Sequence, residues 1–193
     1  NLKHMKTQEQ IQLINDTINK TKENLKSSAP NFIFWGALIA TMSLIHYGFP
    51  EIIQKTRYSA LIYWVSIPIL GMALTVIYNI KKREKRGFET HIGRALKIIW
   101  GVFNIAWVLI IVMSLVKNQN PVHSILFLLG IMVLITGLLI RFKPFSIGGL
   151  AVIACSILLI YNPGVNSLLI NGLAAFLGLL LPGLALSYSK PNV

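Results

Sequence analysis

The chain has 193 residues, of which 54% are hydrophobic and 12% are charged, and its formal net charge is +12. A soluble domain normally carries about a quarter of charged residues, so this composition excludes an ordinary soluble globular protein. Residues 145–189 contain no Asp, Glu, Lys or Arg, a run that a bilayer accommodates and a soluble core does not. The excess of basic residues is explained by orientation in a membrane and requires no nucleic-acid partner.

The N-terminal segment, residues 1–30, is polar and is predicted to be a cytoplasmic amphipathic helix over about residues 7–27. Its apolar residues recur at heptad spacing, which gives the helix a narrow apolar seam. A seam of this kind rests on the membrane surface or pairs with a protein partner or a second copy of the chain. Both interpretations stay open at this point. The seam residues are Ile11, Ile14, Ile18 and Leu25.

Six apolar runs follow, each near the length of about 20 residues that crosses the hydrocarbon core of a bilayer. They predict an all-α, polytopic membrane bundle over residues 31–189 and a cytoplasmic tail at residues 190–193. Proline falls mostly between the runs, where a missing backbone donor costs least, and only Pro68 and Pro182 lie within them. The predicted spans are residues 32–49, 60–80, 96–116, 122–140, 145–161 and 168–188.

Basic residues predict the orientation of this bundle. With six spans, only Lys55, Arg57 and Lys117 fall on one side, and the other fifteen of the 18 basic residues fall on the other. Cytoplasmic loops carry such an excess, so both termini are expected in the cytoplasm. Tryptophan and tyrosine near span ends fit interfacial aromatic belts, with Trp35 and Trp100 assigned to the inner surface.

The densest group of charges directly follows the second predicted span. Juxtamembrane clusters of this kind fix topology and attract anionic head groups, by about 1 kcal/mol per residue. The cluster therefore predicts contact with anionic lipids or with an acidic cytoplasmic partner, beside its topogenic role. Its residues are Lys81, Lys82, Arg83, Lys85 and Arg86.

Catalytic chemistry is not indicated. All six acidic residues lie outside the predicted spans, which argues against a proton relay, a cation site or an intramembrane protease. No nucleophile motif and no cofactor motif is present, so we expect neither an enzyme nor a bound cofactor. Glu84, Glu89 and His91 are the only candidates for a membrane enzyme. His46 and His123 lie at similar predicted depth and are the candidate ligands if the protein binds a metal ion.

Polar residues within the spans indicate helix packing or a path for a solute. Asn104 and Asn171 cost most to bury, and interhelical hydrogen bonding is their usual role. A transport path would instead join Asn104, Asn171 and Thr136 across the bundle. Small residues four apart, such as Gly36 with Ala40, favour close helix packing.

One resemblance is visible. The run Lys20-Thr-Lys-Glu-Asn-Leu-Lys, followed by Phe34-Trp-Gly-Ala-Leu-Ile and His46-Tyr, resembles the start of an uncharacterised family of small multi-spanning membrane proteins of Bacteroidota. Members are often encoded beside winged-helix regulators. The resemblance covers mainly residues 1–50 and implies a bacterial inner-membrane location and a regulatory setting. It assigns no activity and no site residue.

Two functions are compatible with these observations. The first is a non-catalytic regulatory or scaffold component of the inner membrane, acting through the N-terminal helix and the basic cluster on a protein partner or a second copy. The second is a small transporter or channel for an uncharged or anionic solute or a lipid. The scaffold is the primary expectation from the sequence.

Overall fold

The computed structural model describes residue 26 and residues 28–56, 58–84 and 91–189. Every regular element in this part of the chain is helical, and six helices are long and apolar enough to span a membrane. The all-helical, six-span prediction is thereby confirmed for length and composition. The seam residues Ile11, Ile14, Ile18 and Leu25 lie outside the described residues, so the N-terminal amphipathic helix stays a prediction.

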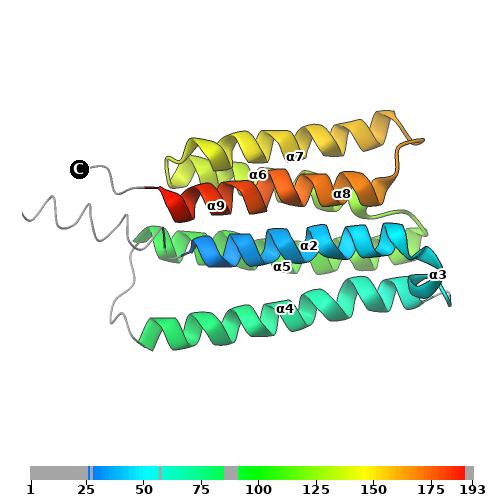
Figure 1. Cartoon of the computed structure of the whole chain (residues 1–193), viewed down its shortest axis with the longest axis horizontal. Helices are drawn as coiled ribbons and strands as arrows, with labels where there is room; N and C mark the ends of the chain where they lie inside the picture. Colours follow the sequence, from blue (N-terminus) through cyan, green and yellow to red (C-terminus); the bar gives the residue numbers. More distant parts are fainter. Residues whose placement is uncertain (1–25, 27, 57, 85–90, 190–193) are drawn as a thin grey trace, which may run out of the picture.

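The helices differ from the predicted spans mainly at their ends (Figure 1). The second and third extend well beyond their apolar runs, because a helix does not stop where its side chains become polar. A short helix between the first two spans was not predicted. The elements are α2 (Ala29–Gly48), α3 (Pro50–Ile53), α4 (Ser59–Glu84), α5 (His91–Lys117), α6 (Val122–Leu139), α7 (Lys143–Tyr161), α8 (Ser167–Ala175), η2 (Phe176–Leu180) and α9 (Leu181–Tyr188).

Local sequence explains the starts and the irregularity of these helices. Proline occupies one of the first two positions of α2, α3 and α7, where its missing N–H costs nothing. The Asn166 side chain caps α8 by accepting from the backbone N–H of Leu168 at 2.9 Å. The last span contains a π-helical segment, η2, just before Pro182, and both features are usual causes of a local irregularity in a helix.

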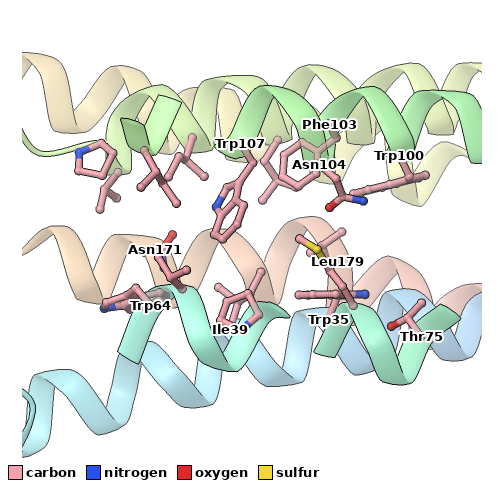
Figure 2. Close-up of a pocket in the computed structure, with 18 of the residues that line it drawn as sticks. Trp35, Ile39, Trp64, Thr75, Trp100, Phe103, Asn104, Trp107, Asn171 and Leu179 are labelled. Carbon is pink, nitrogen blue, oxygen red and sulfur yellow. The ribbon is translucent and has the colours of Figure 1, made fainter. Parts of the chain in front are cut away.

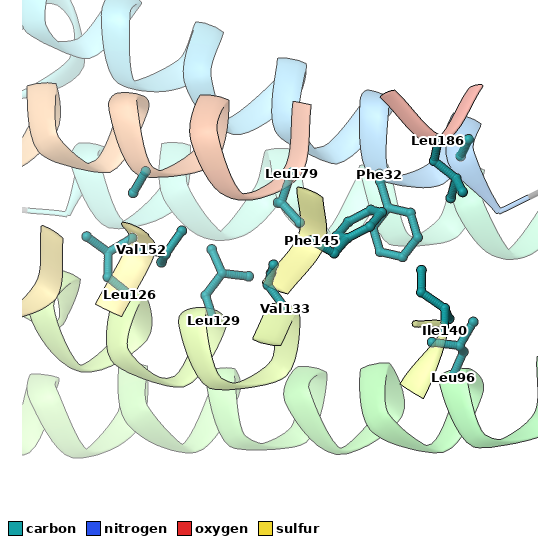
Figure 3. Packing of buried hydrophobic residues seen from close by; sticks show 12 residues of the cluster. Phe32, Leu96, Leu126, Leu129, Val133, Ile140, Phe145, Val152, Leu179 and Leu186 are labelled. Carbon is teal, nitrogen blue, oxygen red and sulfur yellow. The ribbon is translucent and has the colours of Figure 1, made fainter. Parts of the chain in front are cut away.

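The core lies where α2, α6, α7 and the α8–η2–α9 span meet (Figure 3). Phe145 and Val133 are fully buried there, and the Phe32 ring contacts the Phe145 ring in a tilted arrangement, with centroids 4.6 Å apart and planes inclined by 59°. Two buried polar side chains form hydrogen bonds there: Asn171 Nδ2 donates to Ser43 Oγ at 2.9 Å, and Ser156 Oγ donates to the His123 carbonyl at 2.8 Å. These four spans therefore form the tightly packed part of the bundle.

Helices α4 and α5 lie at the edge of this packed part. Of the most apolar 18-residue window of each span, 44% is buried in the last one, 11% in α4 and none in α5. Helix α5 packs against α6, whereas α4 packs closely on no helix except its sequence neighbour α3. Figure 1 shows α4 set apart along one side of the molecule. The bundle thus has a rigid part and one loosely attached helix.

Glycine allows the closest approach in the rigid part. A Cβ atom on Gly149 of α7 would lie 2.5 Å from the backbone nitrogen of Leu134 in α6. A Cβ atom on Gly130 of α6 would lie 2.9 Å from the backbone nitrogen of Ile153 in α7. Both distances are shorter than any contact a real Cβ makes, so the two backbones touch only because neither residue has a side chain.

We expect Gly149→Ala to lower the stability of the folded protein by about 1–3 kcal/mol, because α6 and α7 must separate to accept the methyl group. Gly101→Ala is the matched control: its Cβ would meet nothing within 4 Å, and the exchange should leave stability unchanged or raise it by up to about 1 kcal/mol. Thermal unfolding in mild detergent, followed by circular dichroism, measures both. Equal melting temperatures for the two variants would contradict the close packing.

Candidate functional site

A cleft of about 1180 Å³ lies between α4 and α5 (Figure 2). Helices α2, α6 and α8 close its back, and the cleft runs from one end of the bundle to the other. It exists because α4 and α5 are not packed against each other. Pockets for drug-sized ligands occupy about 300–1,000 Å³, so this cleft is large enough for a bigger molecule.

The cleft is lined by one face of α5 and one face of α4. On each helix the lining residues recur every three or four positions, which is the spacing of a single helical stripe. The α5 stripe is unlike an ordinary lipid-facing surface because polar and aromatic side chains share it, whereas the α4 stripe is mostly apolar. The α5 stripe comprises Gly93, Lys97, Trp100, Asn104, Trp107, Ile111, Ser114 and Asn118, and the α4 stripe comprises Leu61, Val65, Pro68, Met72, Thr75 and Asn79.

All four tryptophans of the chain line this cleft. Trp100 is held by edge-on contacts with Phe32 and Phe103, each with ring centroids 5.5 Å apart. Figure 2 shows Trp107 reaching from α5 into the space between the helices. Hydropathy alone assigned Trp35 and Trp100 to an interfacial belt, whereas the structure places both in the wall of the cleft.

Polar side chains are unevenly distributed along the cleft. One end of the bundle, here called the basic end, contains the start of α2, the end of α4 and the start of α5. Ser28, Asn31, Asn79 and Lys97 line the cleft at the basic end. The opposite end is lined by uncharged groups, among them the side chains of Gln54, Asn118, Gln119, Asn120 and Ser167. No Asp or Glu occurs among the described residues that line the cleft.

A hydrogen-bonded cluster ties α4 to α2 at the end opposite the basic end. His46 is 6% exposed, and its Nδ1 accepts from the indole N–H of Trp64 at 2.9 Å. The indole nitrogen only donates, so the proton of a neutral His46 ring must lie on Nε2. The Gln54 amide nitrogen is placed 3.0 Å from Nε2, and because both of these nitrogens would then donate, we assign the amide oxygen to this position as the acceptor of that proton. Tyr63 adds a third bond, from its hydroxyl to the Met42 carbonyl at 3.0 Å.

A second tie joins the same two helices at the basic end, where Asn31 Nδ2 donates to Asn79 Oδ1 at 3.1 Å. Helix α4 is therefore attached to α2 by hydrogen bonds near both of its ends, with the helix-internal Pro68 between them. In an apolar environment such bonds are worth about 0.6 kcal/mol each on average. Attachment of this strength permits α4 to move relative to the packed part of the bundle.

One polar atom in the cleft wall stands out. The Trp100 Nε1 is buried and has no hydrogen-bond partner within the described part of the chain. A buried N–H without a partner costs about 1–3 kcal/mol, so such groups are rare in stable structures. A ligand in the cleft that offered an acceptor to the Trp100 N–H group would remove this cost.

The transport path proposed from the sequence is partly wrong. Asn104 and Asn171 both line the cleft, as that path requires. Thr136 does not: it is fully buried in α6, and its hydroxyl donates to the Met132 carbonyl of the same helix at 2.7 Å. Periodicity placed Thr136 at a suitable depth, but depth does not determine which face of a helix is turned to a given neighbour.

The other candidate residues are not gathered into a site. Lys81, Lys82 and Arg83 are in the last turns of α4, and Lys85 and Arg86 lie outside the described residues. His46 has both ring nitrogens in hydrogen bonds, and His123 is half-buried on α6. No group of three His, Cys, Asp or Glu side chains that could hold a metal ion is found in the described ranges. His91 is exposed at the start of α5, and Glu89 is not described.

One feature of the sequence indicates the cleft, although a hydropathy value averaged over a whole helix does not reveal it. Along α5, Lys97, Trp100, Asn104, Trp107 and Ser114 fall on one stripe, and the rest of the helix is almost entirely aliphatic. A lipid-facing helix without a partner would not keep its polar and aromatic residues on a single face. This stripe predicts a ligand-facing or helix-facing surface.

We expect Trp64→Phe to weaken the attachment of α4, because His46 Nδ1 loses its donor. Stability should fall by about 1–2 kcal/mol, and backbone amides of α4 should exchange faster with deuterium. Trp107→Phe is the matched control, since the Trp107 indole has no hydrogen-bond partner in the described part of the chain. Thermal unfolding and hydrogen exchange in detergent measure both variants. Equal exchange in α4 for the two would show that the bond does not restrain this helix.

Comparison with known proteins adds no assignment to this site. No protein-family model, no curated protein and no solved structure matches the chain. The interpretation of the cleft therefore depends on the residues that line it and on their geometry.

Proposed function

We propose that this chain is an integral membrane protein that carries a lipid-sized amphiphile, neutral or anionic, through the cleft between α4 and α5. The single observation that supports this function best is the cleft itself, which runs the length of the bundle and is polar at both ends and aromatic between them. A membrane amphiphile has the matching distribution of polar and apolar groups. The small transporter, second among the expectations from sequence, is thereby favoured over the scaffold.

Size supports a lipid-sized occupant. A spanning helix about 10 Å wide and about 30 Å long occupies roughly 2,400 Å³, about twice the volume of the cleft. A transmembrane helix of a partner therefore does not fit without a large movement of α4. A drug-sized molecule would fill only part of the about 1180 Å³. A chain-bearing amphiphile lies between these two limits.

The loose attachment of α4 gives the amphiphile a way in. Because α4 and α5 do not pack together, their gap is open along the side of the bundle, and an amphiphile could enter from the bilayer without passing through water. Movement of α4 about its hydrogen-bonded ties to α2 would widen or narrow the gap. The part of the cleft wall that the structure describes carries no carboxylate for coupling to protons or cations, so we propose passive movement down a gradient.

The orientation follows from charge. Among the described side chains, Lys26, Lys81, Arg94, Lys97, Arg141 and Lys143 belong to the basic end, and Lys55 and Lys117 to the opposite end. By the positive-inside rule we propose that the basic end faces the cytoplasm, with both termini on that side, in a bacterial inner membrane.

Asn104→Leu should reduce the rate at which a dye-labelled lipid crosses reconstituted liposomes by about tenfold, because an amide inside the cleft is replaced by an aliphatic group while the fold is retained. Val112→Leu is the control on the same helix, at an exposed position outside the cleft. Dithionite bleaching of the outer-leaflet dye measures the rate. A wild-type protein that moves no lipid, neutral or anionic, above protein-free liposomes would refute the proposal.

Removal of residues 1–25 separates the two candidate functions. A carrier whose path is the cleft should keep its rate within about twofold, because the described residues that line the cleft all lie after residue 25. The regulatory or scaffold function predicts that the truncated protein still inserts but loses its effect in the cell. A truncated protein that is folded yet moves no lipid would place the N-terminal segment in the transport machinery.

A further inference from the structure

Several N–H groups in the middle of the cleft have no hydrogen-bond partner. The indoles of Trp35 and Trp107 and the amide of Asn104 line the cleft, and none of them is bonded to another group in the described part of the chain. The Trp64 indole differs from them, because it already donates to His46. Trp35, Asn104 and Trp107 are half-buried, and their nitrogen atoms are not completely covered by protein. These N–H groups are therefore open to a molecule in the cleft.

The Trp100 N–H group is also unpartnered, but it is completely covered by protein. An acceptor in the cleft could reach this group only after the indole had turned. The inference below therefore rests on the three groups that are already open to the cleft.

The three open groups lie at different depths along the cleft. Trp35 is the seventh residue of α2, about 9 Å along the helix from its start. Asn104 is the middle residue of α5, about 20 Å from either end, and Trp107 follows it by about one turn. Figure 2 shows Trp35 and Asn104 on facing walls and Trp107 farther along the same space. The donors thus follow the cleft through the middle of the bundle.

The chemistry of these groups restricts the polar part of the occupant. An indole N–H group only donates, so its partner must be an acceptor, and an ammonium group cannot fill that role. The described lining between the two ends of the cleft contains no charged side chain, so a charged group at that depth would meet no opposite charge. An uncharged acceptor meets both requirements. In a membrane lipid, the uncharged acceptor that lies beside the apolar chains is the carbonyl oxygen of an ester.

From these donors we infer that the cleft takes a diacyl lipid and recognises it by its ester carbonyl oxygens, which accept hydrogen bonds from Trp35, Asn104 and Trp107. The inference rests on the proposed carrier function and names the substrate class. As the lipid moves along the cleft, its carbonyl oxygens pass from one donor to the next. The acyl chains lie against the apolar stripe of α4, which includes Val65, Pro68 and Met72.

A matched pair of lipids isolates the carbonyl groups. Diphytanoyl phosphatidylcholine has two ester carbonyls, and diphytanyl phosphatidylcholine has the same head group and chains joined by ether bonds. Each lipid is titrated into the full-length protein in dodecyl maltoside, a detergent without carbonyl groups. We expect the diester to bind about fivefold more tightly than the diether, a ratio that corresponds to about 1 kcal/mol and to the net contribution of one hydrogen bond.

Nuclear magnetic resonance of the indole N–H groups measures this binding at the proposed donors. The protein has four tryptophans, so nitrogen-15 labelling of the indoles gives four signals, each assigned by its Trp→Phe variant. The diester should move the proton signals of Trp35 and Trp107 downfield, because both N–H groups gain an acceptor. Trp64 is the internal control, since its N–H group is already bonded to His46. Equal movement of the Trp64 signal would show a general effect of lipid and overturn the assignment.

Variants test whether these donors cause the preference. Asn104→Leu combined with Trp107→Phe should lower the ratio of diester to diether affinity below twofold. Trp64→Phe is the control, because it removes an indole whose N–H group is not available to a ligand, and it should keep the fivefold ratio. An equal loss of preference in both proteins would show that these donors do not recognise the carbonyl groups.

Two further outcomes separate the sources of failure. A short-chain isoprenoid quinone offers carbonyl groups from another class of membrane lipid, and its displacement of the diester at a lower lipid-to-detergent ratio than the diester itself requires would overturn the ester assignment. Equal affinities of the two phosphatidylcholines for the wild-type protein would overturn carbonyl recognition and leave the carrier function intact. Binding of neither lipid, together with no lipid movement in liposomes, would overturn the carrier function as well.

Discussion

The close contact of α6 with α7 is the constraint on which the rest of the bundle depends. The two backbones meet at Gly130 and Gly149, where a side chain on either residue would collide with the facing helix. In a bilayer there is no hydrophobic force between helices, so close packing of this kind is the main source of helix association. The α6–α7 pair provides the surface against which α5 and the last span are placed, and α2 packs in turn on the last span.

Helix α4 is attached by a different kind of interaction. It contributes almost no close packing and is joined to α2 through Asn31 with Asn79, His46 with Trp64, and the Tyr63 hydroxyl. Hydrogen bonds are directional and few, so they fix the position of a helix end without filling the space along its length. This is why a cleft persists beside α4. A helix attached by packing would have closed it, and a helix with no ties would have no defined position.

How far the sequence predicted this structure depends on the property in question. The six spans were predictable because charge-free runs and the prolines between them carry local information, and the helices lie within a few residues of the expected positions except where α4 and α5 extend past their apolar runs. The cleft was not predicted, because hydropathy does not say which helices are neighbours. Trp35 and Trp100 were assigned to the membrane surface from their depth alone, and Thr136 to a polar path, although its hydroxyl bonds to its own helix.

Charge at the basic end also shows why depth and face must be considered together. A basic residue near the end of a span is sufficiently explained by orientation, and this applies to Lys81, Arg94 and Lys97 alike. The orientation requirement does not specify a helix face, however. Lys97 shares its face with Trp100 and Asn104, whereas Arg94 is turned away from the cleft. A charge that served only to orient the chain could be moved around the helix without loss. The position of a basic residue is therefore described by its depth and by its helix face, and the positive-inside rule uses only the depth.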